Sequence, residues 1–97
     1  MRERDMQHSS GKGSVLISEG RRLSVDYEIA IRPQFDGEAL VAEEIHGRIW
    51  GEKLPGSFLA DWCQSVKRLT LEIADGRRIE ISAKDSSGAF LGWGGFF

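Results

Sequence analysis

The sequence predicts a mainly β domain, either a small antiparallel β-barrel or a strongly curled sheet, with its elements in the order β-β-β-α-β-β-β. Apolar and polar residues alternate along most of the chain, which is typical of strands with one buried side. Acidic-Gly turn pairs separate the alternating segments, and one segment changes to a helical period. Six strands with open edges favour closure, because closure pairs the backbone groups of the edges. A two-sheet sandwich is the alternative.

The N-terminal third predicts a tail followed by two strands. Residues 1–12 are polar and have no periodicity, so we expect a disordered tail and a single domain over residues 13–97. Val15 and Ile17 begin the alternation, and residues 23–32 continue it with five apolar residues on one side. Pro33 has no N–H to donate, so we expect the second strand to end there.

A third strand is expected at about 39–51, after a turn around Asp36-Gly37. Val41, Ile45 and Ile49 share one side of this strand. Glu43 interrupts that apolar side, which predicts either a β-bulge or a position at the rim.

Residues 57–66 predict one short amphipathic helix that caps an end of the sheet. Ser57 is expected to be its N-cap. The apolar sector contains Phe58, Leu59, Trp62, Cys63 and Val66.

Three further strands are expected at 69–73, 79–83 and 89–93. A three-residue loop, Ala74-Asp75-Gly76, pairs Leu71 with Ile79 and keeps both on the buried side, whereas a two-residue turn would mix the two sides. Gly76 then has a positive φ, and the same reasoning applies to Gly20 in the first hairpin. The two hairpins, residues 15–25 and 71–81, resemble each other, through either duplication or convergence on the same turn chemistry.

Size, charge and cysteine content exclude several classes of protein. The chain has 97 residues, which suits one domain with one core. A net charge of −2 disfavours a nucleic-acid partner. Cys63 is the only cysteine, no apolar run is long enough for a membrane span, and no signal peptide is evident. We therefore expect a cytoplasmic protein.

No set of residues in the sequence predicts catalysis, a metal site or a cofactor, so we expect a protein that is not an enzyme. Cys63 lies on the apolar side of the helix and is interpreted as a core residue. His46 and Glu44 share one side of a strand, but a zinc site needs three or four ligands. The carboxylate pairs Asp26/Glu28 and Glu72/Glu80 have the polar parity, where they meet solvent.

Two groups of residues are candidate binding sites. One is a pair of Arg-Arg dipeptides just after the tips of the two hairpins, which could hold phosphates or an acidic partner, or could simply keep the strand edges soluble. The other is a set of aromatic residues, of which Trp93 and Trp62 have the parity or face of the core, whereas Trp50, Phe90 and Phe96 have the opposite parity. The candidate binding residues are Arg21, Arg22, Arg77, Arg78, Trp50, Phe90, Trp93, Phe96 and Phe97.

The function predicted first is a non-catalytic binding module for a protein partner, with a homodimer through the C-terminal aromatic strand as its concrete form. The second is oligonucleotide binding, because a helix after the third of five strands is also the element order of the OB-fold; Trp50 would then stack a base. The third is a ligand carrier or small enzyme with a site at the barrel mouth, near His46 and Glu44.

Overall fold

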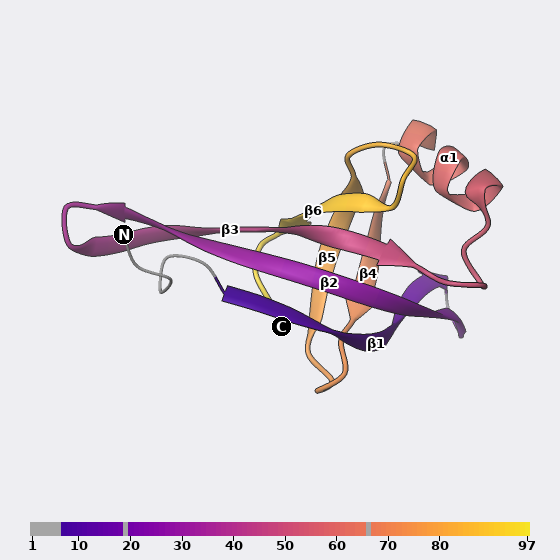
Figure 1. The fold of residues 1–97 in the computed structure, drawn as a ribbon, viewed down its shortest axis with the longest axis horizontal. Helices are drawn as coiled ribbons and strands as arrows, with labels where there is room; N and C mark the ends of the chain where they lie inside the picture. The colour runs from indigo at the N-terminus through magenta and orange to yellow at the C-terminus, as the bar shows by residue number, and fades with distance from the viewer. Residues whose placement is uncertain (1–6, 19, 66) are drawn as a thin grey trace.

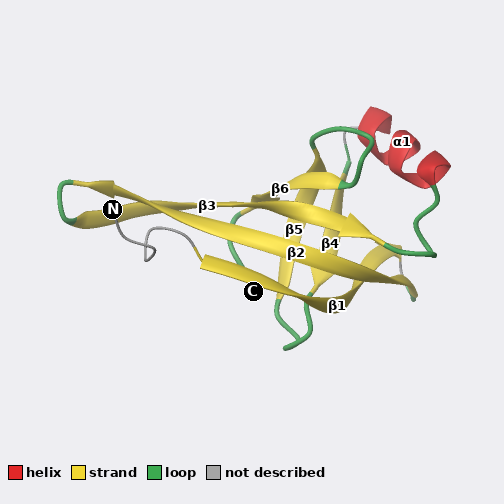
Figure 2. Ribbon diagram, in the orientation of Figure 1, coloured by secondary structure: helices red, strands yellow, loops and turns green. Residues whose placement is uncertain are grey.

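The six strands form one closed antiparallel barrel in the order β1-β2-β3-β6-β5-β4. The computed structural model describes residues 7–18, 20–65 and 67–97, and at 18 and 40–42 it describes the backbone alone. Figures 1 and 2 show the strands, with the single helix at one end of the barrel. The elements are β1 (Gln7–Ser18), β2 (Arg21–Asp36), β3 (Ala39–Trp50), α1 (Gly56–Ser65), β4 (Arg68–Glu72), β5 (Arg78–Ala83) and β6 (Ala89–Trp93). This confirms the predicted fold class.

The topology differs from that of the OB-fold by one strand. An OB-fold is a five-stranded barrel. Here β6 lies between β3 and β5, and it pairs with both. The chain therefore shares the order of its first five strands and the helix with the OB-fold, and the additional strand β6 closes the barrel between β3 and β5.

The first five strands contribute mainly odd-numbered residues to the core, as the alternation predicts. Val25, Tyr27 and Ile29 of β2 are buried, and so are Leu71 of β4 and Ile79 of β5. Most even-numbered residues of these strands are exposed or half-buried because successive side chains of a strand alternate between its two sides; Ala30 of β2 is the buried exception among the described residues. Burial of this apolar face is the main source of stability for a domain of this size.

The turn chemistry sets the register of the two hairpins. Gly20 and Gly76 have φ values of 76° and 92°, which confirms the left-handed positions. Leu71 pairs with Ile79, and the Ile73 N–H donates to the Arg77 carbonyl across the predicted three-residue loop. The first hairpin differs at its tip. Its register shifts between residues 16 and 18, so that the closing pair is 18–21.

The first strand begins earlier than predicted. Residues 7–12 belong to β1 and pair with β2, which corrects the predicted tail over these residues; residues 1–6 lie outside the described part of the chain. The polar composition of residues 7–12 reflects an exposed strand, since β4 pairs with β1 only at residues 14–16. Gly11 lies opposite Tyr27, and a side chain at Gly11 would crowd the tyrosine hydroxyl.

The second and third strands extend past the barrel as a two-stranded ribbon, residues 32–44, here called the arm (Figure 1, left). Pro33 does not end β2, contrary to the prediction, because β1 stops opposite Ile31 and β2 is an edge strand at the proline. The bulge lies at residue 41 rather than at Glu43, which is exposed in the arm. The side chain of Val41 lies outside the described part, so its predicted burial remains a prediction.

The helix covers one end of the barrel, as predicted. Leu59 and Trp62 are buried in the core, together with Leu54 from the preceding loop. The helix starts at Gly56, where the Pro55 carbonyl accepts the first backbone hydrogen bonds. Ser57 therefore lies inside the first turn instead of capping it, and Val66 lies outside the described residues.

The last strand has the opposite parity from the one predicted. Phe90 is fully buried and Trp93 is 44% exposed, so the predictions for both are wrong. The cause is the loop before β6, which pairs Ile81 with Gly92 and thereby turns the even-numbered residues inward. The buried side of one strand predicts the buried side of the next strand only when the length and pairing of the connecting loop are known.

The hydroxyl of Tyr27 joins β2 to the loop between β4 and β5, because it accepts a hydrogen bond of 3.1 Å from the Ala74 N–H. Replacing Tyr27 with phenylalanine is expected to lower the free energy of unfolding by about 1 kcal/mol, since one part-buried hydrogen bond is lost while the ring remains. Urea denaturation of the two proteins measures the difference. An unchanged midpoint would show that this bond contributes nothing.

Candidate functional site

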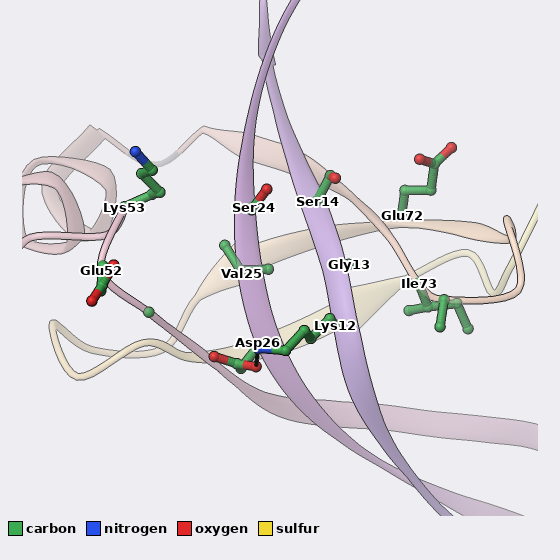
Figure 3. Close-up of a pocket in the computed structure, with 12 residues that line it drawn as sticks. Lys12, Gly13, Ser14, Ser24, Val25, Asp26, Glu52, Lys53, Glu72 and Ile73 are labelled. Carbon is green, nitrogen blue, oxygen red and sulfur yellow. Dashed lines mark hydrogen bonds and ion pairs between the residues drawn. The ribbon is translucent and has the colours of Figure 1, made fainter.

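One surface hollow lies beside β1 and β2 and has a volume of about 650 Å³. Figure 3 shows that charged and hydroxyl side chains surround much of it, with Lys12 and Asp26 meeting at 2.9 Å. Glu72 at its edge is held by Arg22 and Arg78, at 3.0 and 3.1 Å. Ligand pockets are mostly apolar with a few unpaired polar groups. This hollow has a more polar lining, and Lys12, Asp26 and Glu72 are already paired, so it is a weaker candidate for a binding site.

Another hollow has a more suitable lining. It has a volume of about 280 Å³ and lies between the C-terminal half of α1 and the outer ends of β4, β5 and β6. We call it the α1–β6 groove. Its lining residues are Trp62, Cys63, Lys67, Arg68, Ser82, Ala83 and Trp93. Two indole rings and two cations around a cavity of this size suit a single apolar or aromatic side chain with an acid nearby.

Trp93 is held in place on the wall of the α1–β6 groove. The Arg68 guanidinium lies 4.3 Å from the centroid of its ring, and the indole N–H donates to the Ser82 hydroxyl at 2.8 Å. Arg68 is itself oriented by Glu80 at 3.4 Å. The ring is therefore fixed from one face and from its nitrogen. A side chain ordered in this way loses little conformational entropy on binding.

The outward side of β6 is apolar throughout. Ala89, Leu91 and Trp93 point away from the core, while Phe90 and Gly92 point into it. Leu91 and Trp93 are 37% and 44% exposed. Such a strand has apolar side chains on both sides, although only its inner side is covered by the barrel. Its outer side is the natural place for a partner.

The other aromatic candidates lie apart from the α1–β6 groove. Trp50 is exposed at the far end of β3, as predicted. Phe96 is half-buried against the core under the Arg77 guanidinium, and Phe97 is exposed beside β5, where its backbone pairs with Arg78. Phe90 is excluded from direct contact with any partner by its burial, since the ring faces Gly47 inside the barrel.

The two Arg-Arg dipeptides are brought together only in part. Arg22 and Arg78 share one carboxylate, that of Glu72, and the Arg78 hydrogen bond is the largest influence that lowers the pKa of Glu72. Arg77 pairs with Asp75 at 2.8 Å, and its backbone N–H lowers the pKa of that carboxyl. Arg21 is exposed near the tip of the first hairpin. Three of the four guanidinium groups thus already face acids.

The residues considered for chemistry do not form a common site. Cys63 is half-buried in the α1–β6 groove, whereas His46 lies on β3 opposite Leu91. Glu44 is exposed at the start of the arm. Within the residues that the structure describes, no three His, Cys, Asp or Glu side chains are placed to hold a metal ion.

Sequence reasoning missed most of the α1–β6 groove. The sequence does not single out Lys67, Arg68 or Ser82, and it favours core positions for Trp62 and Cys63. The groove depends on the register between β5 and β6 and on where α1 rests, neither of which has a sequence signal here.

Among the described residues, no helix is long and apolar enough to cross a membrane, and α1 itself has 10 residues. Comparison with protein-family models, with curated proteins and with solved structures finds no match to this chain.

Proposed function

We propose that this protein is a non-catalytic interaction module that associates with a second copy of itself through the outward side of β6 and the α1–β6 groove. The observation that supports this most is Trp93, an indole that is held by Arg68 and Ser82 and still has nearly half of its surface exposed. Tryptophan and arginine are enriched among the residues that dominate binding energy at interfaces.

The composition of the surface also supports a protein partner. Leu91 and Trp93 make an apolar strip on a sheet surface whose neighbours, such as Ser82 and Glu80, are polar. An apolar centre with a polar rim is the usual arrangement at protein interfaces. The Arg-Arg dipeptides give less support to an oligonucleotide, because Arg22, Arg77 and Arg78 are engaged by Glu72 and Asp75.

Sedimentation velocity over the micromolar range tests the proposal. We expect the native protein to self-associate and Trp93→Ser to weaken its dimer by about tenfold or more, as for a central interface tryptophan. Trp50→Ser is the matched control, since both indoles are 44% exposed but Trp50 does not line the groove. A native protein that stays monomeric at high micromolar concentration, or equal effects of the two variants, would contradict the proposal.

A further inference from the structure

The arm extends beyond the barrel without further strands on its edges, within the part of the chain that the structure describes. Residues 32–44 form a ribbon of only two strands, and no other strand of the described chain pairs with either side of it. It makes the molecule long, with extents of 43 × 27 × 23 Å (Figure 1). Two-stranded ribbons are marginally stable in water unless something packs on them, and their free edges invite further pairing.

The tip of the arm carries an exposed aromatic ring among acids. Phe35 is 54% exposed, in the strand that leads into the turn. Asp36 and Glu38 lie beside it, and Glu43 and Glu44 lie further along β3. With Arg32 as its single cation, the arm has a formal charge of −3.

The α1–β6 groove is complementary to this tip. Lys67 and Arg68 are exposed at its rim, and Trp62 and Trp93 form part of its walls. Its volume of about 280 Å³ is sufficient for one phenyl ring. An aromatic side chain flanked by carboxylates therefore matches the groove in shape, and Lys67 supplies the complementary charge, while Arg68 is shared with Glu80 at 3.4 Å.

The β6 wall of the groove ends near the base of the arm, whereas α1, its other wall, lies on the side of the molecule away from the arm (Figure 1). The last β3–β6 pair joins His46 to Leu91, so Trp93 comes two residues beyond it in the direction of the arm. The tip lies about 20 Å further on, at about 3.3 Å per residue. The tip of the arm therefore lies far from the groove of its own chain, and we place it in the groove of a second copy. Two arms that lie antiparallel across a two-fold axis bring each tip to the base of the other, which makes a closed and self-complementary dimer.

We infer that the occupant of the α1–β6 groove is Phe35 of a second copy of this chain, with the acids of its arm facing Lys67 and Arg68. This inference rests on the proposed self-association and names the contact that produces it. Each dimer then contains two identical arm-to-groove contacts. Its dissociation constant is expected to rise with salt, because the facing charges are near the surface.

Complementation between two variants tests the contact. Phe35→Ser removes the tip and keeps the groove, and Trp93→Ser damages the groove and keeps the tip. Neither change reaches the core, since both side chains are exposed. We expect each variant alone to dimerise about tenfold more weakly or worse. A mixture of the two should associate more strongly than either alone, because the mixed dimer keeps one intact contact.

Fluorescence anisotropy measures this with Phe35→Ser labelled at its N-terminus and titrated with unlabelled Trp93→Ser or unlabelled Phe35→Ser. Tighter binding of Trp93→Ser supports the inference, and equal binding overturns it. Phe97→Ser, which alters another exposed phenylalanine outside the arm and the groove, should dimerise as the native protein does. If Phe35→Ser dimerises normally while Trp93→Ser does not, the inference fails and the proposed use of β6 stands. A native protein that stays monomeric would contradict both the arm-to-groove contact and the proposed self-association.

Discussion

Phe90→Ala is expected to lower the free energy of unfolding by about 3–5 kcal/mol, the usual loss when a fully buried aromatic side chain is truncated. The ring is completely buried against Gly47 of β3, and it is the largest side chain that is buried in this way. Domains of this size have a total stability of only about 5–15 kcal/mol. The variant should therefore unfold at a far lower urea concentration than the native protein.

Leu91→Ala is the matched control for this prediction, because it changes the next residue of the same strand on the opposite side. Leu91 is 37% exposed, so its truncation should lower the free energy of unfolding by about 1 kcal/mol or less. Both values come from urea denaturation followed by circular dichroism. A larger loss for Leu91→Ala would mean that β6 has the parity expected from the sequence, and equal losses would contradict the burial of Phe90 alone.

The parity of a strand could be predicted wherever a short turn connects it to its neighbour. The loop around Gly76 has a defined length and a defined left-handed residue, so Leu71 and Ile79 had to share one side. The loop before β6 has no such constraint. The length of this loop turns Phe90 inward and Trp93 outward. Because the sequence does not fix how the loop pairs β5 with β6, the predicted sides of Phe90 and Trp93 are both wrong.

The candidate site was harder to predict than the fold because its residues come from elements that only tertiary packing brings together. Trp93 could be chosen from composition alone, but its contacts with Arg68 and Ser82 depend on the register between β5 and β6, which the loop before β6 leaves open. The exposed position of Phe35 depends on the arm, which the expected end of β2 at Pro33 had excluded. A proline predicts a strand end only where the missing N–H would face another strand.

Two cross-strand pairs of glycine and an aromatic residue shape the barrel, and neither was evident from the sequence. Gly11 lies opposite Tyr27, and Gly47 lies opposite Phe90. In each pair the glycine has no side chain, so that the ring can lie over its backbone, an arrangement that offsets the weakness of glycine in strands. At Gly47 the structure therefore requires glycine because of space and not because of an unusual backbone angle, whereas at Gly11 a methyl group would only crowd the tyrosine hydroxyl at 3.2 Å.

Gly47→Ala is consequently expected to destabilise the barrel by about 2–3 kcal/mol or more, as overpacking of a filled core does. A methyl group at Gly47 would lie 2.9 Å from the Phe90 ring and closer still to the Glu28 carbonyl oxygen. The ring could shift, but the carbonyl belongs to the β2 backbone, so β2 and β3 would have to separate.

Gly56→Ala isolates the effect of this crowding. A methyl group at Gly56 meets nothing within 4 Å, and this glycine opens α1, where alanine is a good helix former. We expect its free energy of unfolding to change by less than about 0.5 kcal/mol. If the two alanine variants had the same urea midpoint, the close approach of β2, β3 and Phe90 at Gly47 would be wrong. A large loss for Gly47→Ala alone would confirm that the backbones of β2 and β3 approach closely at Gly47.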